Sequence, residues 1–305
     1  MPTGAASTAG DGAAPPSNWY RRRLGLGNLV LMPTSDAMWR KPSSVSLQKS
    51  GARALFSSTH PWLHMLELWN LWDPTTVKNA TRDLAFADEF ISAKLVENVV
   101  DYDVSDAVVV NLGPSPMVTG TEHPAIVPAW KSTWLKGGRI KSAERAALIK
   151  VVKATNLGGA QFRGWDWLGN RIRSFPRDTP LFISAQDEIG QVRVDPRVFT
   201  NETAESIAEQ TFTLKLNLWW SPGDTDCFIH NEHPFLEVHT QIHGLGRMQK
   251  FAERDQLTLY EDVVMPIGYS HDPFCRVTGY NQWTYPWHRY YADTDSVWLA
   301  VELHP

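Results

Sequence analysis

Histidine and carboxylate side chains are concentrated in one short segment in the last third of this 305-residue chain. Between positions 230 and 243 the sequence holds His230, Glu232, His233, Glu237, His239 and His243, and His271 and His288 follow. Imidazole and carboxylate groups are the usual protein ligands of divalent transition metals. Because residues i and i+2 of a β-strand point to the same face, an H-x-E segment on a strand presents two metal donors side by side. The segment therefore predicts a metal site.

The stretch FLEVHTQIHG adds a polar row to this predicted site. Glu237, His239 and Gln241 alternate with apolar residues, so they share one face of the predicted strand. Inward positions of a small barrel are usually apolar, and a buried Glu, His and Gln would need a metal, a ligand or hydrogen-bond partners. The alternative is that this row faces solvent. We take Glu237 and His239 as the candidates for moving protons where they do not bind the metal.

His288, in YPWHRYY, has two interpretations. It could act as a general base or as a late metal ligand. A histidine among aromatic residues is more often a packed, hydrogen-bonded side chain, and this second interpretation is favoured.

The elements that must position these residues are predicted to be strands. In TFTLKLNLWW, which begins at Thr211, apolar residues recur at every second position, the period of a half-buried strand. Six more runs of this kind follow, each bounded by Gly, Pro, Asp or Asn, and none has the pattern of a helix. We therefore expect a β-sandwich or a closed barrel over residues 201–305.

The region before this barrel is predicted to be a mixture of helix and strand. Residues 142–155 (SAERAALIKVVKAT) place Ala, Leu, Ile and Val at helical spacing behind a Ser, and residues 89–98 (EFISAKLVEN) are a second helix candidate. Short strands are expected at residues 181–183 and 192–194, which Pro and Gly set off from their neighbours.

The composition of the chain excludes several classes of partner. Its 29 Lys and Arg against 33 Asp and Glu give a net charge of −4, so no strong positive field is available to bind nucleic acid. The two cysteines, Cys227 and Cys275, form no disulfide framework, which fits a cytoplasmic protein. No stretch approaches the roughly 18 uncharged apolar residues that cross a bilayer, and the first seventeen residues lack a secretory signal.

Two motifs in this region resemble those of the cupin family, whose members fold as a double-stranded β-helix. The first family motif, G(X)5HXH(X)3–4E(X)6G, is similar to Asp224-(X)5-His230-Asn-Glu232-(X)4-Glu237-(X)6-Gly244, where Asp replaces the first Gly and Glu232 replaces the second His. The second, G(X)5PXG(X)2H(X)3N, is similar to Tyr260-(X)5-Pro266-Ile-Gly268-Tyr-Ser-His271-(X)3-Cys275, where Tyr and Cys replace the first Gly and the last Asn. Fifteen residues separate the motifs, as in compact family members, and the resemblance covers residues 211–305.

The resemblance implies a set of metal ligands. In the family, two His and one Glu of the first motif and the His of the second motif bind the metal, which here implies His230, Glu232, Glu237 and His271. A one-residue insertion in the alignment makes His233 the second histidine in place of Glu232, and the sequence leaves both alignments open. With Glu232, two His and one carboxylate would form the facial triad of Fe(II) oxygenases; with His233, Fe, Mn, Ni, Co and Zn all fit.

The hypothesis that follows is a non-haem, Fe(II)-dependent cupin oxygenase that acts on a small organic molecule. Arg247, on the strand predicted after the first motif, is the candidate for holding a substrate carboxylate, although a surface arginine is the alternative. Whether 2-oxoglutarate is a co-substrate stays open. The competing hypotheses are a Lewis-acid isomerase, lyase or condensing enzyme that uses Zn or another divalent metal, and a non-catalytic small-molecule-binding cupin. Cupins often pair through sheet edges, so the resemblance also implies a homodimer.

The chain thus divides into a disordered tail (1–17), an N-terminal α+β region (18–200) and the cupin-like barrel (201–305). The alternative for the middle part is a degenerate second cupin, because His60-Pro-Trp-Leu resembles His233-Pro-Phe-Leu and Gly120-Thr-Glu-His123 repeats the GxxH of the second motif. Two observations favour the α+β interpretation: the long stretch of sequence between His60 and His123, and the helices predicted in this region.

Overall fold

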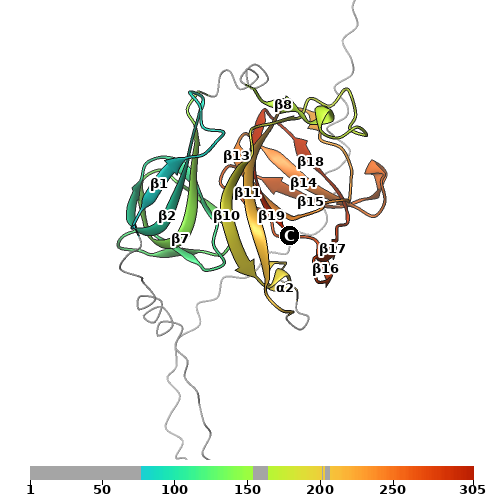
Figure 1. Cartoon of the computed structure of the whole chain (residues 1–305). Helices are drawn as coiled ribbons and strands as arrows, with labels where there is room; N and C mark the ends of the chain where they lie inside the picture. The colour runs from blue at the N-terminus through green and yellow to red at the C-terminus, as the bar shows by residue number, and fades with distance from the viewer. Residues whose placement is uncertain (1–76, 154–163, 201, 203–206) are drawn as a thin grey trace, which may run out of the picture. The chain divides into compact units, whose positions relative to one another are not determined.

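The fold is that of a computed structural model, which describes residues 77–153, 164–200, 202 and 207–305 (Figure 1). The predicted tail at 1–17 and the His60-Pro-Trp-Leu segment lie outside these residues. Strands dominate the described part, which confirms a mainly β fold. None of the described helices is long and apolar enough to span a membrane.

The C-terminal part of the chain is built around two larger antiparallel sheets, and β16 (Arg276–Gly279) and β17 (Gln282–Thr284) form a third, two-stranded sheet (Figure 1). One contains the order β13-β19-β11, and the other has the order β12-β18-β14-β15. These strands are β11 (Gln210–Ser221), β12 (Thr225–Asp226), β13 (Leu236–His243), β14 (Gly246–Phe251), β15 (Leu259–Met265), β18 (Trp287–Ala292) and β19 (Ser296–His304). After the hairpin of β14 and β15, Ser270 bridges Thr240 and returns the chain to the first sheet. The chain therefore alternates between two sheets in the order of a jelly roll.

The alternation predicted for the first of these strands is confirmed by its burial. On β11, Phe212, Leu214, Leu216 and Leu218 are all fully buried and lie on one face. In β19 every residue except the last is buried, because this strand lies between β11 and β13. This face of β11 belongs to a cluster that also contains residues of the N-terminal strands, whereas a second cluster contains Met248 of β14, Tyr290 of β18 and Trp298 of β19.

The first sheet also takes in strands from the region before residue 201. β9 (Phe182–Ile183) pairs with the end of β11 and with β8 (Asp166–Trp167), while β10 (Asp187–Val194) pairs with the start of β11. The strands predicted at 181–183 and 192–194 are therefore present. The boundary at residue 201 stays a prediction, but part of the region assigned to the N-terminal side contributes to the C-terminal sheet.

The two helices predicted in the N-terminal region are wrong. Residues 89–98 lie mostly within β2 (Ile91–Val104), and residues 142–155 overlap β7 (Gly138–Val151), which pairs with β2 along its full length. Ala146, Ala147 and Ile149 of β7 are fully buried. A short run of small and apolar residues has no clear period, so burial on both faces of a strand imitates one face of a helix.

The N-terminal strands follow an order like that of the C-terminal part. They are β1 (Ala80–Asp83), β2, β3 (Ala107–Asn111), β4 (Met117–Thr119), β5 (Ala125–Val127), β6 (Ser132–Leu135) and β7. The second half of β7 pairs with β3, which pairs with β6, whereas the first half pairs with β4, which pairs with β5. The 14-residue strand β7 thus serves two groups of strands. This order fits the degenerate second barrel and not the α+β interpretation.

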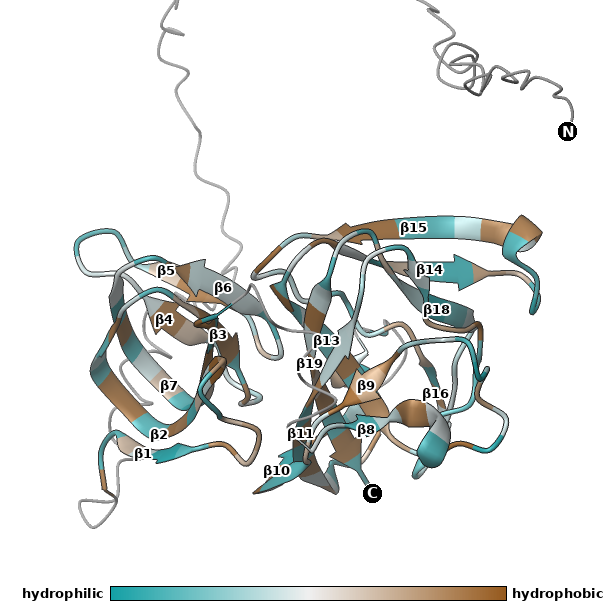
Figure 2. Ribbon diagram, turned by 90° about the horizontal axis from the view of Figure 1, so that it is seen from above, coloured by the Kyte–Doolittle hydropathy of each residue, from teal (hydrophilic) through white to brown (hydrophobic). Residues whose placement is uncertain are grey.

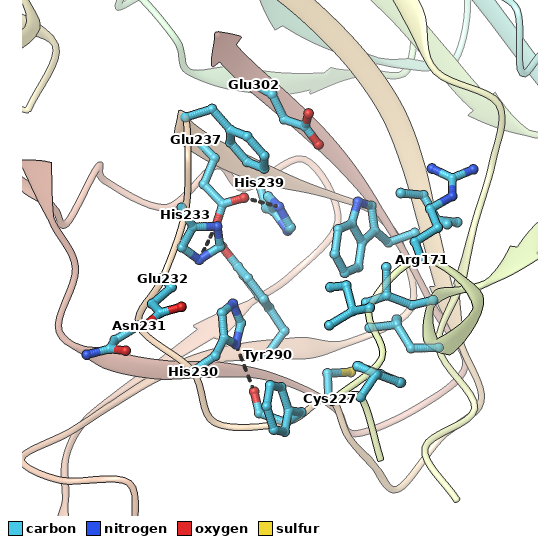
Figure 3. A pocket seen from close by; sticks show the side chains of 18 of the residues that line it. Arg171, Cys227, His230, Asn231, Glu232, His233, Glu237, His239, Tyr290 and Glu302 are labelled. Atoms are coloured by element: carbon cyan, nitrogen blue, oxygen red, sulfur yellow. Dashed lines mark hydrogen bonds and ion pairs between the residues drawn. The ribbon is translucent and has the colours of Figure 1, made fainter. Parts of the chain in front are cut away.

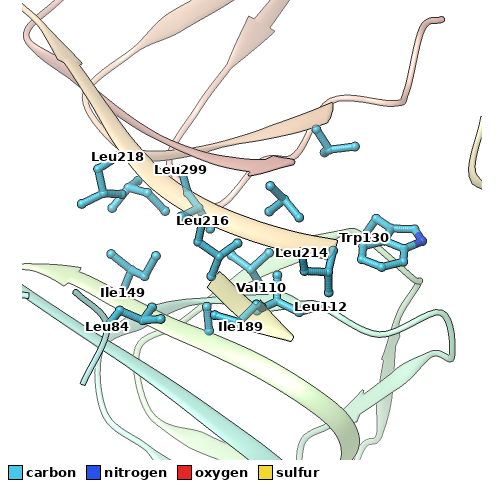
Figure 4. Close-up of a cluster of buried hydrophobic side chains, with 14 of the residues drawn as sticks. Leu84, Val110, Leu112, Trp130, Ile149, Ile189, Leu214, Leu216, Leu218 and Leu299 are labelled. Atoms are coloured by element: carbon cyan, nitrogen blue, oxygen red, sulfur yellow. The ribbon is translucent and has the colours of Figure 1, made fainter. Parts of the chain in front are cut away.

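A shared core joins the two groups of strands, which Figure 2 shows side by side with hydrophobic stretches on both. Leu84, which follows β1, belongs with Val110 and Ile149 of the N-terminal strands to the same cluster as Leu214 and Leu216 of β11 (Figure 4). Burial of these side chains is the main favourable free energy for holding the strands together.

Replacing Leu216 by Ala is expected to lower the free energy of unfolding by about 2–5 kcal/mol, because a fully buried Leu leaves a cavity when it is truncated. Urea denaturation followed by circular dichroism measures this change. The matched control is Val198→Ala, whose side chain is exposed and should cost no more than about 0.5 kcal/mol. A Leu216 variant as stable as the control would contradict the proposed core.

Candidate metal centre

The C-terminal barrel encloses a cavity of about 560 Å³ with a mostly apolar wall. Figure 3 shows that His230, His233, Glu237 and His239 gather on one side of it, and that Arg171 lies across from them. A mostly apolar cavity with a few converging polar groups is the usual form of a small-molecule site.

Three histidines form the group that could hold a metal ion, and two of them, His230 and His233, line the cavity. His230, His233 and His288 offer ring nitrogens that all lie within 4.8 Å of one another. His288 lies on β18 and exchanges backbone hydrogen bonds of 2.9 Å with His230, so these two rings are held at a centroid distance of 4.4 Å. His233 belongs to the segment that leads into β13, and its ring lies 5.0 Å from that of His288.

Hydrogen bonds to carbonyl groups orient two of these rings. Nδ1 of His230 lies 3.0 Å from the carbonyl oxygen of Phe228, and Nδ1 of His288 lies 2.8 Å from that of Pro286. A carbonyl oxygen can only accept, so each Nδ1 carries the proton and each Nε2 keeps its lone pair. This is the arrangement in which a histidine presents Nε2 to a metal.

The facing nitrogens fit a shared cation. Nε2 of His233 lies 3.0 Å from Nε2 of His288; since Nε2 of His288 can only accept, Nε2 of His233 donates this hydrogen bond, and a metal ion would take the place of the shared proton. Buried Glu237 has Oε1 at 3.5 Å from Nε2 of His233, and this oxygen has no hydrogen-bond partner among the described residues. A divalent ion would accept these lone pairs and the carboxylate, so the donor set of three imidazoles and one carboxylate fits a transition metal.

Glu237 and His239 lie next to this group on β13. Both side chains are buried, and Oε2 of Glu237 is 3.3 Å from Nε2 of His239. The His239 ring stacks on Tyr290 at 4.2 Å with an angle of 9° between the planes. Gln241 is also fully buried, so the polar row faces the interior and the solvent-facing alternative is wrong.

Burial also sets the charge of these groups. It lowers the pKa of His233 to about 4 and that of His239 to about 3, and it lowers the pKa of His230 and His288. The imidazoles are therefore neutral near pH 7, the form in which histidine binds metals. Burial likewise raises the pKa of Glu237.

His271, the ligand implied by the second motif, lies outside the group. Its Nε2 accepts a hydrogen bond of 2.9 Å from the backbone N–H of His239 and lies 2.8 Å from the hydroxyl of Tyr290. Its Nδ1 donates to the carbonyl of Asp272 at 2.8 Å. Both nitrogens are occupied, so His271 supports β13 and Tyr290 rather than offering a lone pair to a metal.

Glu232 also lies outside the group, because it is exposed and His233 takes the position next to His230. The expectation of two donors at i and i+2 required a strand, but residues 231–235 form none. The geometry therefore favours the alignment with the one-residue insertion.

Arg247 is not placed to bind a cofactor or substrate. It lies on β14, its Nε donates to both carboxylate oxygens of Asp293 at 2.8 and 2.9 Å, and its Nη1 donates to Asp262 at 2.8 Å. It does not line the cavity. Its guanidinium already has two carboxylate partners, which corrects the predicted role.

Comparisons with known proteins give structural neighbours but no sequence relatives. No family model matches the chain, and no curated protein matches it. Solved structures that match include the Bacillus subtilis oxalate decarboxylase with Mn(II) centres (11% identity, 76% of this chain and 79% of that chain, TM-score 0.25). Another is a cupin 2 conserved barrel domain protein from Leptotrichia buccalis (8% identity, 75% of this chain and 91% of that chain, TM-score 0.23). A third is a DUF861 family protein of unknown function from Pseudomonas syringae pv. tomato (12% identity, 72% of this chain and 86% of that chain, TM-score 0.26).

At these identities and TM-scores the alignments by themselves carry no argument about this chain. Its own strand order, alternating between two sheets, is the double-sheet arrangement in which cupins are built. The C-terminal part has a cupin-type fold.

The sequence pattern favours a packed residue over a late metal ligand for His288, but the structure places it in the histidine group. Tyr290, which lines the cavity, is not among the predicted site residues. Both lie on β18 two positions apart and point the same way. The signal available was the alternation of His288 and Tyr290 on a strand next to the His-rich segment.

Proposed function

We propose that this chain is a metal-dependent enzyme, and specifically a non-haem Fe(II)-dependent oxygenase that acts on a small organic molecule. The observation that carries the proposal is the convergence of three neutral imidazoles, two of which line an apolar cavity, with the buried carboxylate of Glu237, whose Oε1 has no hydrogen-bond partner among the described residues. A donor set of this type also suits Mn, Co, Ni and Zn, so the choice of iron rests on the hypothesis of oxygen chemistry.

The protein's own groups have separate tasks in this proposal. His230, His233 and His288 would hold the ion through Nε2, and the ion supplies the redox chemistry of an oxygen-dependent reaction. The aromatic and aliphatic wall binds the substrate and excludes water. Oε1 of Glu237 and Nε2 of His239 have no hydrogen-bond partner among the described residues, so these two side chains can accept or donate a proton inside the cavity.

Binding of nitric oxide to the Fe(II)-loaded, full-length protein tests this proposal. Three or four protein ligands leave at least one coordination position open, so the anaerobic protein is expected to give the electron paramagnetic resonance signal of a high-spin iron–nitrosyl complex. A protein that retains iron but gives no such signal would contradict an oxygenase. Substrate turnover that persists without O2 and with Zn in place of Fe would instead support the Lewis-acid alternative.

A further inference from the structure

We propose that the cavity binds an amphipathic substrate that carries one negative charge, with its apolar body against the aromatic wall and its anionic group at Arg254. This inference rests on the proposed function for the role of the cavity and names the class of substrate.

Arg254 is a cation of the cavity wall to which the described residues supply no carboxylate. The other arginine of the wall, Arg171, donates to Oδ2 of Asp166 at 3.2 and 3.3 Å. At another part of the wall, His304 lies 2.7 Å from a carboxylate oxygen of Glu302. Arg254 is exposed, and its guanidinium carbon lies 5.1 Å from the centre of the Phe228 ring. Its charge is therefore available to a ligand.

Phe228 connects Arg254 to the metal group. Its ring stacks on His230 at 5.7 Å with an angle of 5° between the planes. The backbone of Phe228 has a φ of 84°, which few residues other than Gly adopt, and its N–H donates to Asp226 at 2.9 Å. A residue held in such a conformation is often part of a site. An anion bound at Arg254 would thus direct the rest of the molecule along Phe228 toward the three histidines.

The remaining wall limits the charge and the polarity of the substrate. Phe175, Ile183 and Trp298 present apolar surface to the cavity, which favours an aliphatic or aromatic body. The exposed carboxylate of Glu232 also lines the cavity. Glu237 and Glu302 line it as well, and among the described residues of the wall Arg254 is the one arginine without a carboxylate partner, so a single negative charge is favoured over a dianion such as 2-oxoglutarate.

A matched pair of probes, phenylbutyrate and its neutral amide, tests the inference. We expect the Zn-loaded, full-length protein to bind the acid about tenfold more tightly than the amide in isothermal titration calorimetry, because a guanidinium pairs with a carboxylate in a charge-assisted hydrogen bond. In Arg254→Gln this preference should disappear while the affinity for the amide is unchanged. Arg254→Lys should keep part of the preference.

Arg171→Gln is the control, since Arg171 is an exposed arginine of the same wall that already has a carboxylate partner. It should keep the preference for the acid. Persistence of the preference in Arg254→Gln would place the anion elsewhere, at the metal for example, and would overturn the inference. So would equal affinity of the two probes, or no binding of either, in the unmodified protein. No turnover or oxygen is involved, so failure of the oxygenase proposal would leave this result standing.

Discussion

Replacing His288 by Ala is expected to lower the affinity of the protein for Co(II) by more than about 100-fold. Removing a residue that only orients a metal ligand costs at most about 100-fold, and losing a ligand should cost more. The reason is that His288 supplies one of three converging imidazoles and its Nε2 lone pair has no donor other than the facing His233. Competition with a chromophoric chelator measures the dissociation constant. A variant that binds Co(II) as tightly as the unmodified protein would remove His288 from the site.

His271→Ala is the control that separates a ligand from a supporting residue. His271 is as fully buried as His288, but both of its nitrogens are engaged by Asp272, Tyr290 and the backbone of His239. We expect this variant to be less stable, by roughly 2–4 kcal/mol for a lost buried hydrogen-bond network, and to retain metal when folded. Loss of Co(II) from a folded His271→Ala protein with no loss from His288→Ala would restore the ligand set implied by the second motif.

The second large effect is expected for Glu237→Gln, which should weaken metal binding and increase the stability of the metal-free protein. The variant removes a negative charge from the neighbourhood of His233, so the affinity for Co(II) should fall by about 10–100-fold. In the metal-free protein the same change removes a buried carboxylate whose Oε1 has no hydrogen-bond partner among the described residues, and the free energy of unfolding should rise by about 1–3 kcal/mol.

The dependence of this stability effect on pH has a defined sign. Burial raises the pKa of Glu237 above its value in the unfolded chain, so the metal-free protein is destabilised as the pH rises from the unfolded pKa through the folded one. The stabilisation by Glu237→Gln should therefore be small below the unfolded pKa and grow as the pH rises. Urea denaturation of both metal-free proteins across this range measures it. A variant that is less stable at every pH would show that the carboxylate has a partner in the folded state.

The sequence predicted the C-terminal fold well because the first half of β11 alternates between buried apolar residues and less buried ones. The alternation of Phe212, Leu214 and Leu216 on β11 has only one structural interpretation. The runs in β2 and β7 contain Ala, Leu, Ile and charged residues, and their strand conformation is set by pairing with each other over a long distance along the chain. Pairing of this kind leaves no local signal, so the helices predicted there were wrong.

The candidate site was predicted in part, for a similar reason. The cluster around His230 and His233 is visible in the sequence, but the choice between Glu232 and His233 depends on whether residues 231–235 form a strand. His288 reaches the site because β18 lies beside the segment that carries His230, and that proximity follows from the order of the strands in the sheet. The second motif led to His271, whose hydrogen bonds only the structure shows.

Extended X-ray absorption fine structure at the iron edge of the Fe(II)-loaded, full-length protein tests the central claim most directly, because scattering from the rings counts the imidazoles bound to the ion. The account predicts three imidazoles in the unmodified protein, two in His288→Ala and three in His271→Ala. A spectrum with no imidazole scattering, or one in which His271→Ala loses an imidazole and His288→Ala does not, would contradict a metal centre formed by His230, His233 and His288.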